Sequence, residues 1–360
     1  MAQPRTLGVE EEFLLIGARD GELRPVGDPV AHAADTRSDG QFEHELKREQ
    51  AELGTTPHTD LGELHAELRR RRVELARSAD EHGVRLLAVG VAPTDDGATT
   101  TREDRYETMS DIFGETARGA LSCGMHVHVS VESRAEGVAL LNGVRPWLPL
   151  VLALSANSPF RGGRDTSYES YRAMLWQRWP TAGATGPFAD VADYERIVAA
   201  LIESGAALDE GMLYFDARLS AKYPTLEFRV ADVCVHTGDA VALAGLCRAV
   251  VEGCARGVLP PVPPDAGRAE RLRAANWRAA RHGVTDQLVD PRTGGLVDAW
   301  ALVDGLFDAL QPVLGDAAEV FDGVATIRTR GTGSRLQRDT FARTGDLDAV
   351  VDTLAAATLA

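Results

Sequence analysis

The sequence predicts a single α+β domain built around an antiparallel sheet. Strand-like runs and helix-like runs are grouped rather than regularly alternating, and the part of the 360-residue chain beyond Thr237 is mainly helical. Such grouping favours an antiparallel sheet with packed helices over repeated βαβ units. Because the sequence shows neither an internal repeat nor a domain linker, residues 1–360 are expected to form one domain.

The first part of the chain contains apolar runs separated by polar connections. Residues 60–82 have leucines at helical spacing, with Asp60 as the expected N-cap and Gly83 as the stop. The other elements expected here are a strand at 6–16, a polar, aspartate-rich loop at 28–40, a buried strand at 85–91 and a mobile stretch rich in Thr, Asp and Arg at 93–110.

The rest of the chain combines a long irregular segment with a strand pair and helices. Residues 157–188 are dense in Gly, Pro, aromatic residues and Arg, which is typical of a binding loop rather than a linker. The other expected elements are a helix at 134–155 interrupted at Pro146 and Pro149, a helix at 191–206, a strand pair at 213–220 and 225–235, and C-terminal helices broken by prolines at 260–264 and by an arginine-rich loop at 328–338.

Composition and charge exclude several classes of protein. Hydrophobic residues make up 44% of the chain and charged residues 26%, as in ordinary globular proteins. The net charge of -16 argues against nucleic acid or an anionic membrane as the main partner, because both usually require a basic surface. The four cysteines lack CxxC spacing, and no uncharged apolar run is long enough to span a membrane. A reduced, cytoplasmic protein without structural zinc is therefore expected.

Three strand-like runs each place two chemically capable side chains at positions i and i+2. The pairs are Glu10 and Glu12 in LGVEEEFLLI, His126 and His128 in CGMHVHVSV, and Glu227 and Arg229 in TLEFRVA. Alternate residues of a β-strand share one face, so each run has a polar face and an apolar face. We expect one sheet whose apolar face packs on helices and whose polar face lines a charged cavity. Such a face suits a divalent cation and a phosphate group.

Each pair also has a plainer interpretation. A run of glutamates is often a solvated edge, but apolar residues flank Glu10 and Glu12 on both sides. Burying two carboxylates without a counter-charge costs on the order of several kcal/mol, so Mg²⁺ or Mn²⁺ is indicated. The two histidines could bind zinc in a metal-dependent hydrolase, or one could be a structural hydrogen-bond donor. Glu227 and Arg229 could form a simple ion pair.

Further charged residues are weaker candidates. Glu45 and Glu52 are seven residues apart, which puts them on one face of a helix but on opposite faces of a strand. Periodicity alone predicts an exposed helix there. Arginine offers the bidentate contacts that phosphate groups accept, and the candidates for anion binding are Arg172, Arg178, Arg328, Arg330, Arg335 and Arg338. The chain contains neither a Walker-type phosphate loop nor a Rossmann fingerprint nor a GxSxG elbow.

Five motifs together resemble the bacterial carboxylate-amine ligases of the YbdK type, in the second glutamate-cysteine ligase family. The motifs are GVEEE, GMHVHV, SPFRGGRDT, WPTAG and TLEFRVAD, and the similarity runs from residue 6 to about residue 345. This resemblance implies the glutamine synthetase-like catalytic fold, an antiparallel sheet curled into a funnel with helices on its outside. It also implies an enzyme that uses ATP and two or three Mg²⁺ or Mn²⁺ ions to form a γ-glutamyl amide through an acyl phosphate.

The resemblance also implies roles for individual residues. The metal-binding residues it implies are Glu10, Glu12, Glu45, Glu52, His126 and Glu227. Arg229 would contact the transferred phosphate and Arg172 the amino acid substrate. The candidates for contacts with ATP are Arg229, His126, Arg330 and Arg335. A metal role for Glu45 and Glu52 requires a bulge or a strand end between them. Residues 93–110 and 157–188 would supply the lid and the amino acid pocket.

The sequence departs from the family pattern at some positions, and it leaves other functions open. The LKREQ run at 46–50 is more charged than the resemblance leads us to expect, and Cys123 stands where a serine is usual. His128 has no role that the resemblance requires. The alternatives are a hydrolase that uses His126 and His128, an enzyme on the same fold that phosphorylates a guanidino group, and a nucleotide-binding protein without activity. The sequence identifies neither the acid nor the amine, nor whether the chain forms a homo-oligomer.

Overall fold

An antiparallel sheet lies at the centre of the protein. The computed structural model describes the chain except for residues 1–3, 19, 38–41, 95–96, 260–261 and 315–317. The strand order is β2-β3-β1-β5-β9-β8, and β4 pairs with the end of β1. Within the described residues these seven strands are β1 (Leu7–Gly17), β2 (Phe42–His44), β3 (Gln50–Gly54), β4 (Val84–Leu87), β5 (Gly124–Ser130), β8 (Ala217–Leu219) and β9 (Thr225–Asp232).

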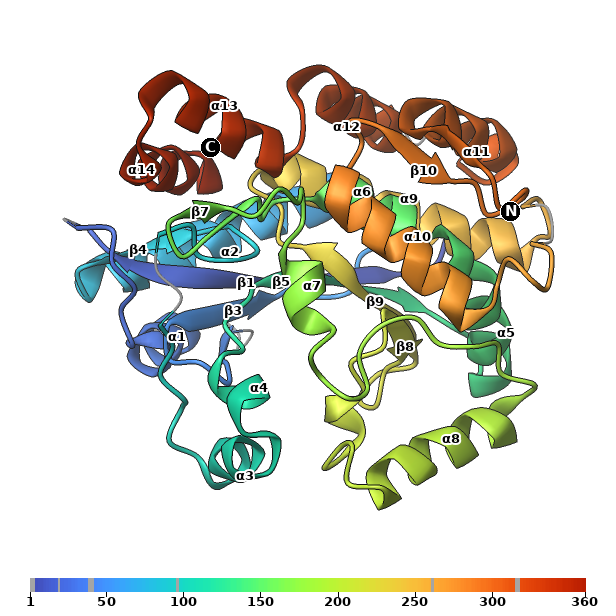
Figure 1. Cartoon of the computed structure of the whole chain (residues 1–360), viewed down its shortest axis with the longest axis horizontal. Coiled ribbons are helices and arrows are strands. Elements are labelled where there is room, and N and C mark those ends of the chain that lie inside the picture. The colour runs from blue at the N-terminus through green and yellow to red at the C-terminus, as the bar shows by residue number, and fades with distance from the viewer. Residues whose placement is uncertain (1–3, 19, 38–41, 95–96, 260–261, 315–317) are drawn as a thin grey trace.

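Two short hairpins lie outside this sheet, and helices surround it (Figure 1). The hairpins are β6 (Phe160–Arg161) with β7 (Arg164–Asp165), and β10 (Gln287–Val289) with β11 (Leu296–Asp298). The helices up to the middle of the chain are α1 (Gly27–Asp35), α2 (Leu61–Glu81), α3 (Asp104–Phe113), α4 (Glu115–Arg118), α5 (Arg134–Val144), α6 (Leu148–Ser155), α7 (Arg172–Trp176) and α8 (Val191–Glu203). The later helices are α9 (Thr237–Ala255), α10 (Ala269–His282), α11 (Ala299–Leu314), α12 (Ala318–Arg330), α13 (Gly333–Thr344) and α14 (Leu347–Thr358).

Several predicted elements form for the expected local reasons. The Asp60 side chain accepts a hydrogen bond from the Glu63 amide and begins α2, and Gly83, at φ +71°, follows the helix end. The predicted helix at 134–155 is interrupted at its prolines by a 3₁₀ turn, η1 (Arg145–Trp147), between α5 and α6. By length and composition this run could cross a membrane, but 83% of its most apolar stretch is buried inside the fold. It is therefore a core segment here.

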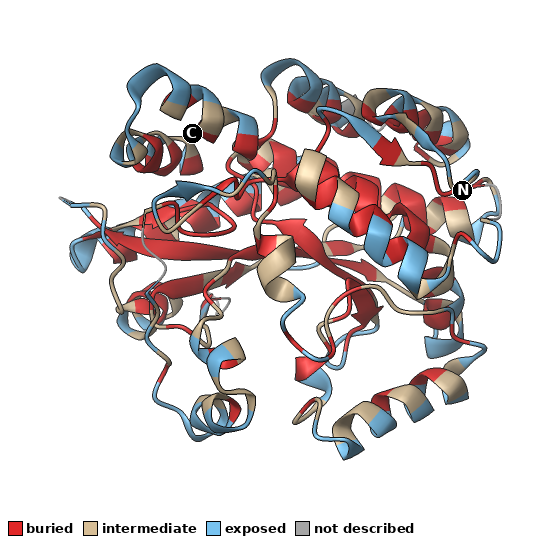
Figure 2. Cartoon of the chain, in the orientation of Figure 1, coloured by how far each residue is buried: buried red, intermediate tan, exposed pale blue. Residues whose placement is uncertain are grey.

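One face of the sheet packs on the main helical layer, and most of that face is buried (Figure 2). Phe13 and Leu15 of β1 and Met125 and Val127 of β5 belong to this apolar core. Glu11, the middle glutamate of the triplet, lies on the same face and is fully buried. Its carboxylate accepts hydrogen bonds of 2.8 and 2.5 Å from Arg72 of α2. This pair neutralises a charge that would otherwise be buried alone.

Three predicted loops are wrong in part because each contains a helix. Residues 27–35 form α1, whose Val30, Ala31 and Ala34 are buried at helical spacing; residues 38–40 of that predicted loop lie outside the described residues. The polar stretch at 93–110, of which residues 95–96 are not described, leads into α3, which buries Met109. The arginine-rich run at 328–338 comprises the end of α12 and the start of α13. In all three cases a few buried contacts with distant segments outweigh a polar local composition.

The segment carrying Glu45 and Glu52 is a hairpin, so the helix that periodicity predicted is wrong. Glu43 of β2 is opposite Glu52 of β3, and Glu45 lies just beyond the end of β2. Glu45 and Glu52 therefore do not share one strand, because β2 ends at His44 and β3 begins at Gln50, and this removes the parity conflict. The charged LKREQ run contacts residues 99–100, which are distant in sequence: buried Lys47 donates to Thr100 Oγ1 at 3.0 Å, and Glu49 accepts from the Thr99 amide at 2.9 Å.

Candidate active site

A cavity of about 610 Å³ lies on the polar face of the sheet, away from Glu11 and α2. The strands that line it are β1, β2, β3, β5, β8 and β9, and its other walls come from α3, residues 176–179 and residues 209–223. Antiparallel pairing aligns the predicted side chains across the cavity floor. The cross-strand partners are Glu10 with His126, Glu12 with Glu52, and His128 with Glu227.

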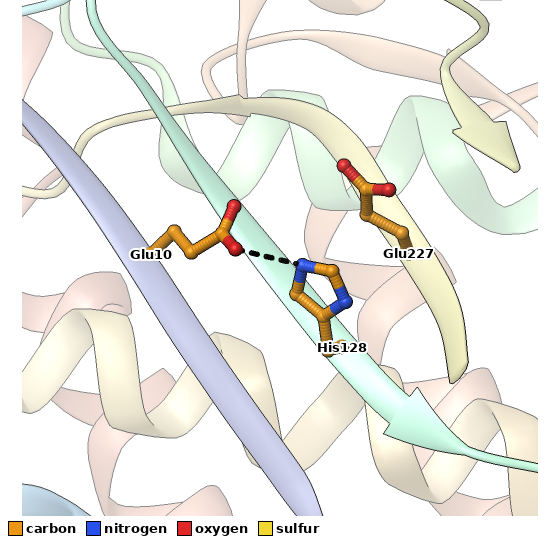
Figure 3. A group of neighbouring side chains, drawn as sticks. All are labelled: Glu10, His128 and Glu227. Carbon is orange, nitrogen blue, oxygen red and sulfur yellow. Dashed lines mark ion pairs between the residues drawn. The ribbon is translucent and has the colours of Figure 1, made fainter. Parts of the chain in front are cut away.

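The first acidic group consists of Glu10, His128 and Glu227, whose ligand atoms lie within 4.8 Å of one another. Figure 3 shows His128 projecting from β5 between the two carboxylates. His128 Nε2 is 3.3 Å from Glu10 Oε1, and its Nδ1 is 2.9 Å from Thr225 Oγ1. The histidine that the resemblance left without a role is therefore placed to be a ligand.

Positive neighbours keep both carboxylates of this first group ionised. Burial opposes ionisation of Glu10, but hydrogen bonds from His126 and His128 outweigh it and hold the Glu10 pKa well below its usual range. Burial likewise opposes ionisation of Glu227, and Arg229 and Arg218 outweigh it, so the Glu227 pKa is lowered. This group is electrostatically balanced by the protein itself.

The second acidic group consists of Glu12, Glu45 and Glu52, which come from β1, the end of β2 and β3 and also lie within 4.8 Å of one another. Removal from water and the neighbouring Glu45 carboxylate together raise the Glu12 pKa. Removal from water, a hydrogen bond with Glu45 and like charges raise the Glu52 pKa well above its usual range. Three oxygen donors that repel one another are a suitable set of ligands for Mg²⁺ or Mn²⁺, which prefer hard oxygen ligands.

His126 lies between the two acidic groups. Its Nδ1 is 3.0 Å from Glu10 Oε2, and its Nε2 is 3.8 Å from Glu12 Oε1. Nε2 is buried without a hydrogen-bond partner among the described residues. Burial and the charge of Arg229 lower the His126 pKa, which favours a neutral imidazole with a lone pair to offer. Through Nε2, the side chain could ligate one cation beside Glu12, while Nδ1 stays bonded to Glu10.

Arg229 completes the floor of the cavity through an irregularity in β9. Met125 pairs with Ala231 and Val127 with Phe228, so β9 carries one extra residue opposite His126. The Arg229 guanidinium forms an ion pair with Glu227 and lies over the rings of Trp176 and Tyr214, at 5.8 and 6.0 Å from their centroids. Its Nε has no hydrogen-bond partner among the described residues. A buried guanidinium with donor capacity to spare suits a phosphate group.

Arg172 is buried beneath this floor rather than on the cavity wall. Its guanidinium lies so close to Gly124 that a Cβ there would be 2.2 Å from Arg172 Nη2. It also lies 5.2 Å from the Trp176 ring centroid and 4.0 Å from Asp232. The side chain therefore supports the end of β5 from behind, and Gly124 is required by this close approach.

The structure does not bring the other arginine candidates to the cavity. Arg330 forms an ion pair with Asp239 at the start of α9, and Arg335 is exposed and pairs with Asp339. Arg328 and Arg338 bind Asp304 and Asp165, and the exposed Arg178 is absent from the cavity lining. Helices α12 and α13 lie in the layer beyond the opposite face of the sheet (Figure 1), so ATP contacts by Arg330 and Arg335 conflict with this arrangement.

Sequence reasoning missed several residues that line the cavity. Arg218 of β8 is directly opposite Glu227 and donates to it at 2.7 Å. The residue lies two positions from Asp216 in a predicted strand, the same i, i+2 signal that identified the other pairs. The other missed lining residues include Arg105, Asp209, Trp176, Trp179, Tyr214 and Tyr223. Most of these come from helices and irregular segments, where no alternating pattern marks them; Tyr214, by contrast, alternates with Asp216 and Arg218 in the predicted strand at 213–220.

Comparison with known proteins places the chain in a family. The model of the glutamate-cysteine ligase family 2 (GCS2) matches residues 6–353. The chain belongs to this family. A Frankia alni relative, provisionally named glutamate–cysteine ligase 2-2, is 48% identical over 370 residues, which cover 97% of this chain and 95% of the relative. Family 2 membership confirms the expected ligase, an enzyme that joins carbon to nitrogen.

Solved structures confirm the predicted fold. The glutamate–cysteine ligase from Francisella tularensis, in complex with AMP, superposes with a TM-score of 0.68 at 15% identity and covers 99% of this chain and 88% of its own. The bifunctional glutathione synthetase from Pasteurella multocida gives a TM-score of 0.71, also at 15% identity and over 99% of this chain. The family 2 chain spans 52% of the Pasteurella protein's length. At such identity the likeness concerns the glutamine synthetase-like α+β fold alone.

Proposed function

We propose that this family 2 protein joins an amino acid carboxylate to an amine while it converts ATP to ADP and phosphate. One observation carries the proposal: two acidic groups flank His126 on the floor of one cavity, with Arg229 beside them. Three carboxylates that repel one another need a cation, and a buried arginine with free donor capacity suits a phosphate. The AMP bound to the Francisella protein of the same fold supports a nucleotide in this cavity.

Two or three Mg²⁺ or Mn²⁺ ions fit the two acidic groups. The residues that would hold them are Glu10, His128 and Glu227 in one group, Glu12, Glu45 and Glu52 in the other, and His126 between the groups. When bound, such ions neutralise phosphate oxygens and orient them for transfer. Burial and the neighbouring carboxylates raise the Glu52 pKa, and a cation bound to the group would favour the ionised form.

The remaining steps are assigned to this chain's own residues. The substrate carboxylate attacks the γ-phosphorus and displaces ADP, while Arg229 compensates charge on the transferred group. The amine then attacks the acyl phosphate carbon and releases phosphate, and its proton passes to a carboxylate of the cavity, directly or through water. The aromatic wall of Trp176, Trp179 and Tyr214 limits the access of water, which would hydrolyse the intermediate.

The family name supports glutamate as the acid and an amino acid such as cysteine as the amine.

We further propose that the whole chain acts as one catalytic unit. The four cysteines are free, and three of them are buried, which suits a reducing cytoplasm.

The geometry favours the ligase over a hydrolase built on the two histidines. A zinc site of that kind needs both imidazoles to converge on one ion. Instead, His126 and His128 approach different oxygens of Glu10, and only His128 belongs to a compact group of potential ligands with Glu10 and Glu227.

The test is release of ADP by the full chain with Mg²⁺ and ATP across pairs of amino acids and amines, with mass detection of the condensed product. We expect one acid to support turnover only in the presence of an amine. Glu227→Gln should abolish product formation, whereas Glu203→Gln, an exposed change at the end of α8, should leave it unchanged. Hydrolysis of amides without ATP, or full turnover by Glu227→Gln, would refute the assignment.

A further inference from the structure

Arg218 joins the cavity floor to one of the cavity walls. From β8 it donates to Glu227 Oε2 through Nε at 2.7 Å and to Oε1 through Nη2 at 3.2 Å. Its Nη1 donates to the backbone carbonyls of Glu210, Gly211 and Leu213 at 2.9, 3.0 and 3.1 Å. The side chain is 10% exposed. Five hydrogen bonds to the protein leave this guanidinium little capacity to bind a substrate.

The wall that Arg218 contacts is a segment at residues 209–214, which includes a 3₁₀ turn, η2 (Glu210–Met212). Its far side is fastened to α3. Arg105, in the first turn of α3, forms two hydrogen bonds with the Asp209 carboxylate, at 3.2 and 3.0 Å. The Arg105 and Asp209 side chains are 42% and 48% exposed, so this clasp lies at the cavity rim.

A small apolar cluster supports the clasp from within. It contains Met109 and Ala117 from α3 and α4, Trp179, and Ala207 and Met212 on either side of the clasp residue Asp209. This cluster is separate from the main core, and two of its members also line the cavity. The α3 wall and the 209–214 segment therefore share an apolar contact of their own, and Arg218 connects the 209–214 segment to the sheet by hydrogen bonds.

We propose that Arg218 is a positioning residue that fixes the Glu227 carboxylate relative to the 209–214 segment, so that the Arg105–Asp209 clasp helps to complete the cation site on the cavity floor. The inference rests on the proposed function, because it takes Glu227 as a metal ligand. Partners that hydrogen-bond to metal ligands orient them, and their loss typically weakens metal binding about 10–100-fold.

Arginine is required for this role because its planar fork contacts a carboxylate on one side and backbone carbonyls on another. A lysine would keep one positive charge beside Glu227 but would lose the fixed geometry and most of the carbonyl contacts. Arg218→Lys therefore separates charge from positioning. Arg229, which also pairs with Glu227, is unchanged in that variant and keeps the carboxylate ionised.

The experiment is a titration of the full chain with Mn²⁺ alone, in which electron paramagnetic resonance measures the concentration of free Mn²⁺. We expect Arg218→Lys to weaken Mn²⁺ binding about 10–100-fold. We also expect its kcat to fall while its KM for the amino acid stays within about twofold, because the hydrogen bonds of Arg218 to the protein leave it little capacity to bind a substrate. Wild-type Mn²⁺ affinity in Arg218→Lys would overturn the inference.

Arg105→Gln tests the coupling from the rim, where a half-exposed pair can be removed without risk to folding. We expect it to weaken Mn²⁺ binding several-fold in the wild-type background and to add nothing in the Arg218→Lys background. The matched control is Arg134→Ala, which removes an ion pair of similar exposure, with Glu195, elsewhere on the surface; it should change nothing. Additive effects of Arg105→Gln and Arg218→Lys would overturn the coupling.

Failure of this inference is distinguishable from failure of the proposed function. If the wild-type chain binds no Mn²⁺, the assignment of both acidic groups as cation sites is refuted, and the role of Arg218 falls with it. If the wild type binds Mn²⁺ and all variants bind it equally, only the positioning role is refuted.

Discussion

The two acidic groups share one cavity floor but are held in opposite ways. Glu10 and Glu227 have hydrogen-bond donors or positive side chains beside them, His126 and His128 for Glu10 and Arg218 and Arg229 for Glu227, and their pKa values are lowered. Glu12 and Glu52 face Glu45, and their pKa values are raised. The first group is thus balanced by the protein, whereas the second group is balanced only when a cation binds.

This difference separates two meanings of a buried carboxylate. In the first group each carboxylate also stabilises the fold, because its removal would leave buried, positively charged side chains without a partner. In the second group the repelling carboxylates oppose folding, and their presence makes sense only for a function that supplies positive charge. The predictions below test that distinction, from the largest expected effect to the smallest.

The largest effect should follow removal of one ligand of the second group. Glu52→Gln should lower turnover by about 10³-fold, or about 4 kcal/mol of transition-state stabilisation, because a cation site that orients phosphate loses a ligand. The measurement is amide formation at saturating Mg²⁺ and ATP. A loss of less than about tenfold would mean that this group holds no essential ion.

Without metal, substitutions in the two groups should change the free energy of unfolding in opposite directions. Glu227→Gln should destabilise the fold by about 3 kcal/mol, because Arg218 and Arg229 lose their partner. Glu52→Gln should stabilise it, because one repelling carboxylate is removed. Urea denaturation in the presence of EDTA measures both changes. The same sign for both variants would contradict the comparison.

The pH dependence of these stability differences should also be opposite. The raised Glu52 pKa means that the folded protein binds a proton which the unfolded chain releases, so this carboxyl destabilises increasingly as pH rises above its unfolded pKa of about 4.3. The lowered Glu227 pKa gives a contribution that is present above about pH 4.3 and is lost as pH falls toward its folded pKa.

Denaturation midpoints without metal, between about pH 2 and pH 8, test this contrast. The advantage of Glu52→Gln over the wild type should grow toward alkaline pH, and the deficit of Glu227→Gln should shrink toward acid pH. Excess Mg²⁺ should abolish the advantage of Glu52→Gln, because the ion binds the deprotonated group. Parallel pH curves for the three proteins would contradict the assignment.

The smallest effect should come from the arginines that lie away from both groups. Arg335→Ala should change the KM for ATP by less than about twofold, because Arg335 is exposed and forms an ion pair with the nearby Asp339, away from the cavity. Steady-state kinetics with varied ATP measure it. A rise of tenfold or more would place α13 beside the nucleotide and reverse the conclusion drawn from its position.

Local periodicity predicted the residues of both groups that lie in β1, β5 and β9 but not Glu45 and Glu52 of the β2–β3 hairpin, for which it predicted a helix. Glu10, Glu12 and Glu227 lie on the cavity face because alternation within a strand is set by backbone geometry. The position of Glu45 could not be predicted, because the end of β2 depends on contacts with distant residues. One of these is the hydrogen bond that Thr101 Oγ1 donates to the Glu45 backbone carbonyl. The prediction of the apolar face was also incomplete, because no local pattern indicated that Glu11 would be buried there and neutralised by Arg72 of α2.

Arginines show why the rest of the site needed the tertiary structure. Arg172, Arg218, Arg229 and Arg330 are chemically identical, yet one lies beneath the floor, one braces Glu227, one faces the cavity and one pairs with Asp239 in the helical layer. Each position is determined by partners distant in sequence, and no local pattern encodes those partners.

The sequence by itself determined the α+β class, the ligase family and which side chains share the polar face of each strand, because alternation and motif order are local properties of the chain. Only the tertiary structure decided which carboxylates form a group, which of them are balanced, and which arginines reach them. Charge balance is the sum of interactions across strands, helices and turns, and that sum exists only once the chain has folded.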